Sequence, residues 1–318
     1  MGRVAGRVWC NERVNRLALP VLSAAQVAAL LPDAPARVSW LGMGSDHHAF
    51  ALDGARVLRL PRWPGGGEAL RREARLLAWL APRLGGAALP EVRHLGVASP
   101  LAPEGFSVAR RVPGRSALGF ALTDPVALGG ELGRWLADLH ALNPQGSGLT
   151  VDLDPSGHDW RDAALDDLEA AAGAGVLPGA DAWAARVRAL PDLRKVLPVP
   201  IHGDFAAEHV SLDGQGRLSG VLDWSDAALG DPARDLAGLI HWGDAALLAA
   251  ARVAYPAAGP SCGAVWERAA WYALCRALAD LAFGLTGGAA GGQEAYLRAG
   301  RRALDGLRVW WTNAPIPP

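Results

Sequence analysis

The segment IHGDFAAEHV (residues 201–210) is the most informative part of this chain. It places a His, an Asp and a second His close together, just before a short apolar run. A second segment, VLDWSDAALGDPARDL (residues 221–236), places Asp223 at the end of another apolar run. Loops held by rigid strands are where catalytic and binding side chains are concentrated. Asp204 and Asp223, two carboxylates at strand ends, therefore indicate chemistry at this place in the fold.

Length and composition suit a compact protein with a large core. The chain has 318 residues, of which 51% are hydrophobic, and this length favours two domains or two lobes of one enzyme. Its net charge of −1 gives no electrostatic reason to expect nucleic acid or an anionic membrane. Only Lys195 is a lysine, so a Walker loop ending in Gly-Lys-Ser/Thr is excluded and a site that usually uses Lys must use Arg.

Cysteine usage and the N-terminal segment indicate a cytoplasmic protein. The three cysteines are odd in number and lack C-x-x-C spacing, which supports neither a disulfide framework nor a zinc site. Ser23 and Gln26 form the pattern of a capping box, so we expect a short helix over residues 24–31 in place of a secretory leader. No stretch of 18 uninterrupted apolar residues occurs, and no membrane span is expected.

The first part of the chain predicts a sheet with one prominent helix. Residues 38–60 contain two apolar-rich runs joined at Asp53-Gly54, a dipeptide that favours a hairpin turn. Residues 68–84 carry leucines at helical spacing. Residues 89–99 and 105–114 indicate two more strands, the second closed by Pro113-Gly114.

The second part of the chain is mainly helical in pattern. Helices are predicted over residues 124–142, 160–175 and 181–193, two short strands surround the turn at 213–216, and the glycine-rich segment 286–292 indicates a loop. The expected fold class is α+β, with a small sheet-rich N-terminal lobe (1–114) and a larger helical C-terminal lobe (115–318). A connector is expected at about 108–114.

The residues of the two opening segments fit phosphoryl transfer. That reaction needs a carboxylate to receive a hydroxyl proton, ligands for Mg²⁺ and a cation on the nucleotide phosphates. Asp204 lies in H-G-D-x-x-x-x-H, where His209 can reach the same metal, and Asp223 can hold Mg²⁺ through hard oxygen ligands.

Residues 201–236 resemble the catalytic core of the aminoglycoside and macrolide phosphotransferase family, the antibiotic kinases that share the bilobal protein-kinase fold. That family carries H-G-D-x-x-x-x-N, an apolar run ending in I-D-W, and G-D-P-x-x-D. This chain has residues 202–204, 221–224 and 230–235 in the same order. The resemblance extends more weakly over nearly the whole chain.

The resemblance implies roles for residues of both lobes. Asp204 would be the general base, Asp223 the main Mg²⁺ ligand, His202 a brace of the catalytic loop, and Asp235 its tie to the following helix. In the small lobe, three groups would bind ATP or GTP. Gly42, Gly44 and Ser45 would form a loop over the nucleotide phosphates, and Arg59 would be the strand cation with Glu73 as its partner on the helix. Ala109 and Arg110 would belong to the connector that presents backbone groups to the purine.

Two positions depart from the usual pattern of the family. His209 stands in place of Asn, and Arg59 stands in place of Lys. Imidazole is a poorer Mg²⁺ ligand than an amide oxygen, so the sequence leaves open whether His209 binds the metal directly, through water or not at all. Both departures resemble the macrolide kinases. Arg62 stays an alternative to Arg59, and His47 and His48 are expected in a loop without a metal.

The resemblance implies a cytoplasmic antibiotic kinase that uses Mg²⁺ and ATP or GTP. The expected acceptor is the 2′-hydroxyl of a macrolide amino sugar, and no nucleic acid, membrane or protein partner is implied. Most tryptophans of the second lobe are expected in the core, with one or two available to line an acceptor pocket. An aminoglycoside would need several carboxylates, for which the candidates are Asp226, Asp244 and Asp280. The alternatives are an aminoglycoside or peptide-antibiotic kinase, a metabolic kinase for a small amino alcohol or sugar, and a non-catalytic kinase fold.

Overall fold

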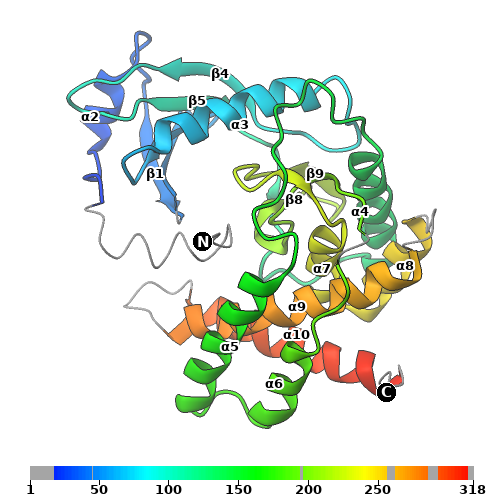
Figure 1. Cartoon of the computed structure of the whole chain (residues 1–318). Helices are drawn as coiled ribbons and strands as arrows, with labels where there is room; N and C mark the ends of the chain where they lie inside the picture. Colours follow the sequence, from blue (N-terminus) through cyan, green and yellow to red (C-terminus); the bar gives the residue numbers. More distant parts are fainter. Residues whose placement is uncertain (1–17, 45, 194–195, 256–261, 286–292, 314–318) are drawn as a thin grey trace.

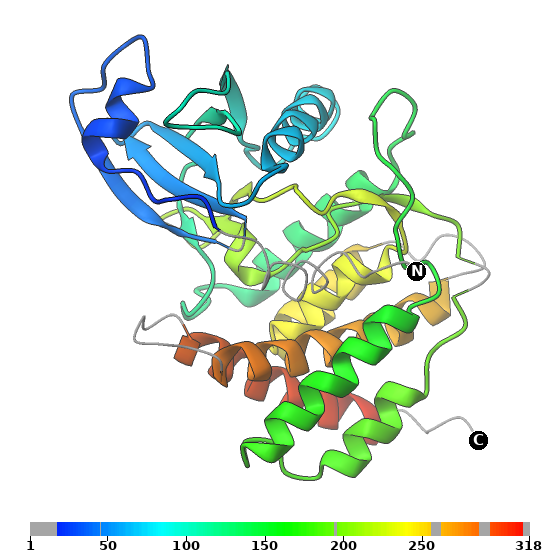
Figure 2. The ribbon, with the colours of Figure 1, turned by 60° about the vertical axis from the view of Figure 1, so that its left-hand side comes forward.

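The computed structural model describes residues 18–44, 46–193, 196–255, 262–285 and 293–313. Its N-terminal part is rich in sheet and its C-terminal part is mainly helical, which confirms the expected α+β class (Figure 1). Figures 1 and 2 show the N-terminal sheet and helix α3 on one side of the molecule and the long helices on the other. None of the helices in the described ranges combines the length and the apolar character that crossing a membrane requires.

The N-terminal part is built on a five-stranded antiparallel sheet. Its strands are β1 (Val38–Met43), β2 (His47–Leu52), β3 (Arg56–Pro61), β4 (Glu91–Gly96) and β5 (Phe106–Arg110), in the order β1-β2-β3-β5-β4. The turn between β2 and β3 contains Asp53 and Gly54 with φ of 53° and 74°, as their hairpin signal predicts. The sequence predicted one run before this turn, but the chain forms two strands there, with a break between β1 and β2.

A short helix covers one face of this sheet. Helix α2 (Ala24–Ala29) begins with the predicted capping box, in which the backbone N–H groups of Ser23 and Gln26 donate to each other's side chains at 2.9 and 3.3 Å. The helix ends at Ala29, with Leu30 as its C-cap, and is therefore two residues shorter than the predicted range 24–31. Its buried Val27 packs in a small core with apolar side chains of β2, β3 and β5. This core fixes the sheet that carries Arg59.

Helix α3 (Gly66–Leu80) connects the sheet to the rest of the molecule. Leu76, Leu77 and Leu80 are buried in the same hydrophobic cluster as residues of the C-terminal helices, although α3 follows directly after β3 in the chain. The single charged side chain that α3 buries is Glu73, at 3% exposure. A helix that packs on both parts places this carboxylate at their junction.

The helical part surrounds the larger core. Its helices are α4 (Pro125–His140), α5 (His158–Gly173), α6 (Ala180–Arg188), α7 (Ala233–His241), α8 (Ala245–Ala254), α9 (Cys262–Leu285) and α10 (Gln293–Asn313). Helix α9 packs against α5, α7 and α10, and α4 packs against α8. The predicted loop at 286–292 lies outside the described residues. Several tryptophans of the second lobe are buried in this core, as expected: Trp224, Trp242, Trp266 and Trp271.

Short strands position the two segments that contain Asp204 and Asp223. One small sheet contains β6 (Arg115–Ser116), β8 (Val210–Leu212) and β9 (Leu218–Val221), and another pairs β7 (Val199–Ile201) with β10 (Ala228–Gly230). A 3₁₀ turn, η1 (Ala207–His209), precedes β8. Asp204 therefore follows β7 and Asp223 follows β9, as predicted from the two apolar runs.

The link between the sheet and the helical part follows strand β5. Strand β5 continues through Arg110, where it pairs with both β3 and β4, and residues 111–114 link it to β6. The strand ends before the Pro113-Gly114 pair that closes its predicted range of 105–114. Ala109 and Arg110 consequently lie within the sheet.

Candidate active site

The segment that follows β7 is tied to the first turn of α7. Asp235 is fully buried, and its two carboxylate oxygens accept hydrogen bonds from the backbone N–H groups of His202 (2.7 Å) and Gly203 (2.9 Å). Gly203 has a φ of +84°, and a Cβ there would lie 2.1 Å from the carbonyl oxygen of Asp226. Only glycine fits this close approach. The loop therefore presents Asp204 from a backbone that is fixed on both sides.

His202 joins this loop to the segment that precedes Asp223. Its Nε2 donates to the carbonyl oxygen of Leu222 at 2.9 Å, and the backbone N–H of Asp204 donates to its Nδ1 at 3.3 Å. Burial lowers the pKa of His202, which keeps the ring neutral, and both hydrogen bonds fit one neutral tautomer. His202 thus lies beneath Asp204 and Asp223 and holds their two loops together.

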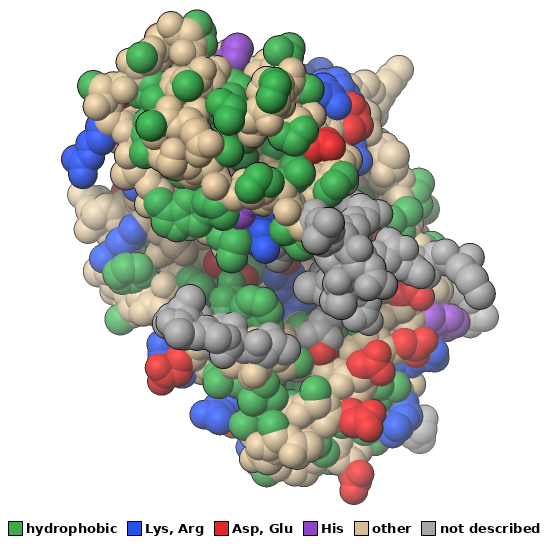
Figure 3. All heavy atoms as spheres, turned by 90° about the vertical axis from the view of Figure 1, so that its left-hand side faces the viewer, with side chains coloured by type: hydrophobic (Ala, Val, Ile, Leu, Met, Phe, Trp, Pro, Cys, Tyr) green, Lys and Arg blue, Asp and Glu red, His purple; other side chains and the backbone are tan. Residues whose placement is uncertain are grey.

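The carboxylate of Asp204 faces the space between the two parts of the molecule. Its side chain is 39% exposed, and Arg276 of α9 donates from Nη2 to Oδ1 at 2.6 Å. Burial alone would raise the pKa of Asp204, but the positive charges of Arg276 and His209 hold this pKa below its usual value. Asp204 is therefore ionised at neutral pH. Figure 3 shows acidic and basic side chains within the hollow between the two parts.

Asp223 lies close to the Asp204 loop, on the other side of His209. His209 Nδ1 donates to the carbonyl oxygen of Asp204 at 2.8 Å, and its Nε2 lies 3.8 Å from Asp223 Oδ2. Asp223 has a φ of +60°, which is uncommon for a residue with a side chain and is concentrated at functional sites. Burial would raise the pKa of Asp223, but Arg59 and His209 lower it overall.

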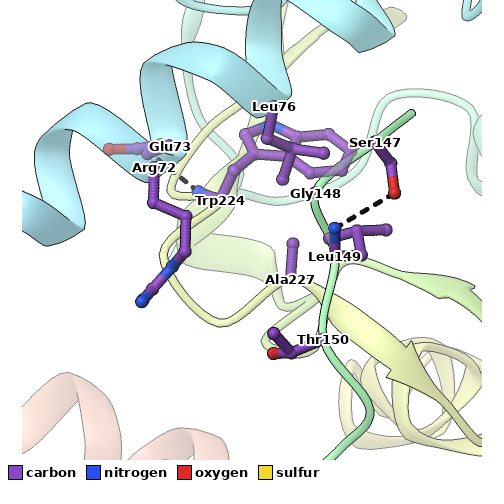
Figure 4. A pocket seen from close by; sticks show the side chains of 9 residues that line it. All are labelled: Arg72, Glu73, Leu76, Ser147, Gly148, Leu149, Thr150, Trp224 and Ala227. Carbon is purple, nitrogen blue, oxygen red and sulfur yellow. Dashed lines mark hydrogen bonds between the residues drawn. The ribbon is translucent and has the colours of Figure 1, made fainter.

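Arg59 and Glu73 meet at the edge of this cluster. Arg59 Nη1 donates to both oxygens of Glu73 at 2.7 and 2.8 Å, and its Nη2 lies 3.5 Å from Asp223 Oδ1. Glu73 Oε1 also accepts the backbone N–H of Trp224 at 3.2 Å (Figure 4). Strand β3, helix α3 and the loop after β9 therefore converge on one carboxylate, which lies beside a small cavity lined by Leu76, Trp224 and the segment 147–150.

Arg62, the alternative to Arg59, has a different position. Its Nη1 donates to the carbonyl oxygen of Gly44 at 2.6 Å, and its backbone N–H donates to the carbonyl oxygen of Asp46 at 2.8 Å. It holds the turn between β1 and β2. Arg59 is the arginine that lies beside Asp223.

The remaining predicted residues of the small lobe lie around this turn and in β5. Gly42 lies at an irregularity of β1 with open space on the side where a Cβ would project, and the N–H of Gly44 donates to the carbonyl oxygen of His47 at 3.0 Å. Ser45 lies outside the described residues. Ala109 is buried in β5, whereas the side chain of Arg110 is exposed.

The prediction that His47 and His48 lie in a loop was wrong. Both are buried at the beginning of β2, because pairing with β1 and β3 extends this strand further toward the glycines than its apolar pattern indicates. His47 Nδ1 lies 3.0 Å from Arg59 Nη2. His47 therefore belongs to the site, which the sequence did not show.

The donor set around Asp223 fits a magnesium ion that takes most of its ligands from phosphates and water. In the described part of the chain, no three His, Cys, Asp or Glu side chains are placed to hold a metal without help. Burial would lower the pKa of His209, but Asp204 and Asp223 raise it to about 9, so its ring is a cation between two carboxylates. Burial and the same two carboxylates raise the pKa of Asp226 to about 7. This excess of carboxylate oxygens suits a hard cation.

Comparisons with known proteins agree with the fold. Residues 39–272 match the sequence model of the phosphotransferase enzyme family, and the chain belongs to this family. It is 28% identical over 203 residues to the viomycin phosphotransferase of Streptomyces vinaceus, an alignment that covers 61% of this chain and 69% of that protein.

Solved structures with the same fold include kinases for different antibiotics. The macrolide 2′-phosphotransferase of Brachybacterium faecium is 27% identical, with a TM-score of 0.56 over 91% of this chain and 95% of that one. A GDP complex of an aminoglycoside 2′-phosphotransferase is 20% identical and shares the fold, with a TM-score of 0.65 over 90% of this chain and 98% of that one. These structures confirm the expected bilobal, kinase-like fold.

Proposed function

We propose that this phosphotransferase transfers the γ-phosphate of ATP or GTP to the 2′-hydroxyl of a macrolide amino sugar, and that it does so in the cytoplasm. The observation that carries the proposal is the approach of Asp204 and Asp223, from two separate loops, to opposite nitrogens of His209 beside the Arg59–Glu73 pair. A proton-accepting carboxylate, a metal-binding carboxylate and a phosphate-binding cation are what direct phosphoryl transfer requires.

Asp204 acts in this proposal as the group that orients the acceptor hydroxyl and receives its proton. Its ionised and partly exposed carboxylate suits that role. Asp223 would hold Mg²⁺, with His209 beside it, and the metal would supply positive charge at the phosphate oxygens. His202 and Asp235 hold the loop in position through the hydrogen bonds to its backbone. Transfer is direct, and no covalent enzyme intermediate is needed.

The nucleotide lies under the N-terminal part, which we assign to residues 1–114, and the acceptor lies against residues 115–318. Arg59 grips the phosphates with a planar guanidinium that Glu73 holds in place. The segment of Gly42 and Gly44 covers the phosphates. Ala109 and Arg110 end the strand from which the connector presents its backbone to the purine.

An aromatic pair on helices α9 and α10 suits an acceptor that is partly apolar. Phe283 is 45% exposed, and its ring packs edge-on against Tyr296 with ring centroids 4.9 Å apart. Of the three carboxylates named for a polycationic acceptor, Asp244 caps α8 by accepting the N–H of Leu247 at 2.9 Å, and Asp280 pairs with His241 at 3.0 Å. Asp226 lies near Asp204, and Arg276 places a positive charge directly on Asp204. The similarity to a solved macrolide 2′-phosphotransferase supports the same acceptor class.

A peptide antibiotic of the viomycin type is the second candidate acceptor. The similarity to the viomycin phosphotransferase favours it, because this relative is as close in sequence identity as the macrolide kinase. Turnover of an aminoglycoside would indicate an aminoglycoside kinase. Turnover of a small amino alcohol or sugar would indicate a metabolic kinase.

Release of nucleoside diphosphate from ATP and GTP, measured with a panel of acceptors, tests the proposal. Purified protein with Mg²⁺ is assayed with erythromycin, viomycin, kanamycin and choline, beside an Asp204→Ala variant. We expect erythromycin to drive turnover that the variant loses. Turnover with viomycin alone would replace the acceptor, whereas nucleotide binding without any acceptor-dependent turnover would contradict the antibiotic kinase.

A further inference from the structure

Arg276 contacts the carboxylate of Asp204 from a helix that lies far from it in the sequence. The guanidinium Nη2 donates to Asp204 Oδ1 at 2.6 Å, and 12% of the Arg276 side chain is exposed. A charge-assisted hydrogen bond of this length is among the stronger contacts that a carboxylate makes in a protein. One oxygen of Asp204 is therefore held in place.

The other oxygen of Asp204 is directed toward the metal-binding side of the site. Asp204 Oδ2 lies 3.6 Å from His209 Nδ1, and the Nε2 of the same ring lies 3.8 Å from Asp223. His209 Nδ1 donates to the backbone carbonyl of Asp204, so its proton is not directed to the side-chain oxygen. Oδ2 is thus the oxygen left to accept a proton near Asp223.

Arg276 also belongs to the helix face that borders the same space. On α9, the partly or fully exposed positions Arg276, Asp280 and Phe283 recur at helical spacing, and Phe283 packs on Tyr296 of α10. Burial would lower the pKa of Arg276, but the negative charges of Asp204, Glu208 and Asp280 raise it overall, so the guanidinium stays charged. Arg276 is therefore placed where this helix face meets the carboxylate of Asp204.

We propose that Arg276 is a positioning residue for Asp204: it holds Oδ1, so that Oδ2 is the oxygen that receives the proton of the acceptor hydroxyl. The inference rests on the proposed function. In the reaction, the acceptor oxygen forms a bond to the γ-phosphorus as its proton moves to Oδ2. The bond from that phosphorus to the β–γ bridging oxygen breaks, and its electron pair leaves with the nucleoside diphosphate.

Kinetics of three variants separate this role from a purely structural one. Arg276→Ala removes the contact with Asp204, and Arg276→Lys keeps one positively charged donor. Arg298→Ala is the control, because it removes an arginine from an exposed ion pair with Glu294 on the neighbouring α10. We expect Arg276→Ala to lower kcat by roughly 100-fold with little change in the KM for nucleotide, because a misplaced catalytic group costs rate more than binding. Arg276→Lys recovers part of this loss, and Arg298→Ala matches the parent.

A crystal structure of Arg276→Ala tests the positioning directly and needs no turnover. We expect the Asp204 carboxylate to change rotamer or lose its defined density, while His202 and Asp235 stay in place. An unmoved, well-defined carboxylate would overturn the inference, as would a kcat for Arg276→Ala within about threefold of the parent. If Arg276→Ala does not fold, Arg276→Gln is examined in the same two ways.

The two proposals fail in distinguishable ways. A parent enzyme that turns over no acceptor contradicts the proposed function, and the position of the Asp204 carboxylate still decides the role of Arg276. A parent that phosphorylates its acceptor while Arg276→Ala keeps both its rate and its carboxylate position contradicts only the role of Arg276.

Discussion

The backbone N–H of Trp224 donates to Glu73 Oε1, although the two residues lie 151 positions apart in the sequence. Glu73 belongs to α3, and Trp224 directly follows Asp223 in the loop after β9. The same carboxylate holds Arg59, so a single buried side chain aligns the strand cation, the helix and the loop of Asp223. Any change in the position of α3 must therefore change the relation between Arg59 and Asp223.

Glu73→Gln is expected to lower both stability and turnover. The amide can still accept from Trp224, but it leaves the Arg59 guanidinium without its nearest negative charge at a site where Glu73 is 3% exposed. Removing one partner of a buried ion pair costs about 3 kcal/mol, and the nearby Asp223 reduces this cost. Denaturant unfolding measures the loss, and Glu68→Gln, on the exposed face of the same helix, serves as the control. Equal stabilities of the two variants would contradict the prediction.

Gly203→Ala is expected to disable the catalytic loop. The added methyl group would lie 2.1 Å from a backbone oxygen in a conformation with φ of +84°, so the loop must shift, at a cost of at least about 2 kcal/mol. Gly214→Ala is the matched control, because its Cβ meets nothing within 4 Å and its φ is not positive. Thermal unfolding and acceptor-dependent turnover measure the difference. A Gly203→Ala protein as active and as stable as Gly214→Ala would show that the loop is not fixed in this way.

Stability is expected to fall in mildly alkaline solution when no metal is present. The pKa of His209 is raised to about 9 in the folded protein, because two carboxylates outweigh the effect of burial, whereas an unfolded histidine titrates near 6.5. A raised pKa stabilises the folded state fully below the unfolded value and loses this contribution as the pH rises through the folded value. The free energy of unfolding should therefore decrease between pH 7 and pH 10.

The His209→Asn variant isolates this pH dependence. Its amide does not titrate, so the difference in unfolding free energy between parent and variant should decrease by up to about 3 kcal/mol from pH 7 to pH 10. Chemical denaturation in the presence of a chelator provides the measurement. A difference that stays constant over this range would show that His209 is neutral between Asp204 and Asp223.

Arg59→Lys is expected to weaken nucleotide binding more than Arg62→Lys does. The Arg59 guanidinium contacts Glu73, His47 and Asp223 with two nitrogens, which an ammonium group cannot reproduce. Arg62 instead holds the carbonyl oxygen of Gly44. We expect a rise of about tenfold in the Kd for nucleotide for Arg59→Lys and a smaller one for Arg62→Lys, measured by calorimetry with Mg²⁺. The reverse order would assign the phosphate cation to Arg62.

Local patterns predicted most of the elements, because helix periodicity, the capping box and the Asp53-Gly54 turn act over a few residues. The order of the motifs around Asp204, Asp223 and Asp235 likewise indicated which loops would meet. Arg276 could not be predicted, since it lies 72 positions from Asp204 and its helix carries a second arginine, Arg268, that looks the same in the sequence. His47 was assigned to a loop because strand ends depend on pairing with neighbouring strands, which no local pattern contains.

Acceptor-dependent release of nucleoside diphosphate by the parent and by Asp204→Asn decides whether the loop of Asp204 is catalytic. Asparagine keeps the shape of the side chain but cannot receive the hydroxyl proton, so we expect kcat with erythromycin to fall by roughly a thousandfold while nucleotide binding is retained. A kcat for Asp204→Asn within about tenfold of the parent would contradict the assignment of this loop as the catalytic one.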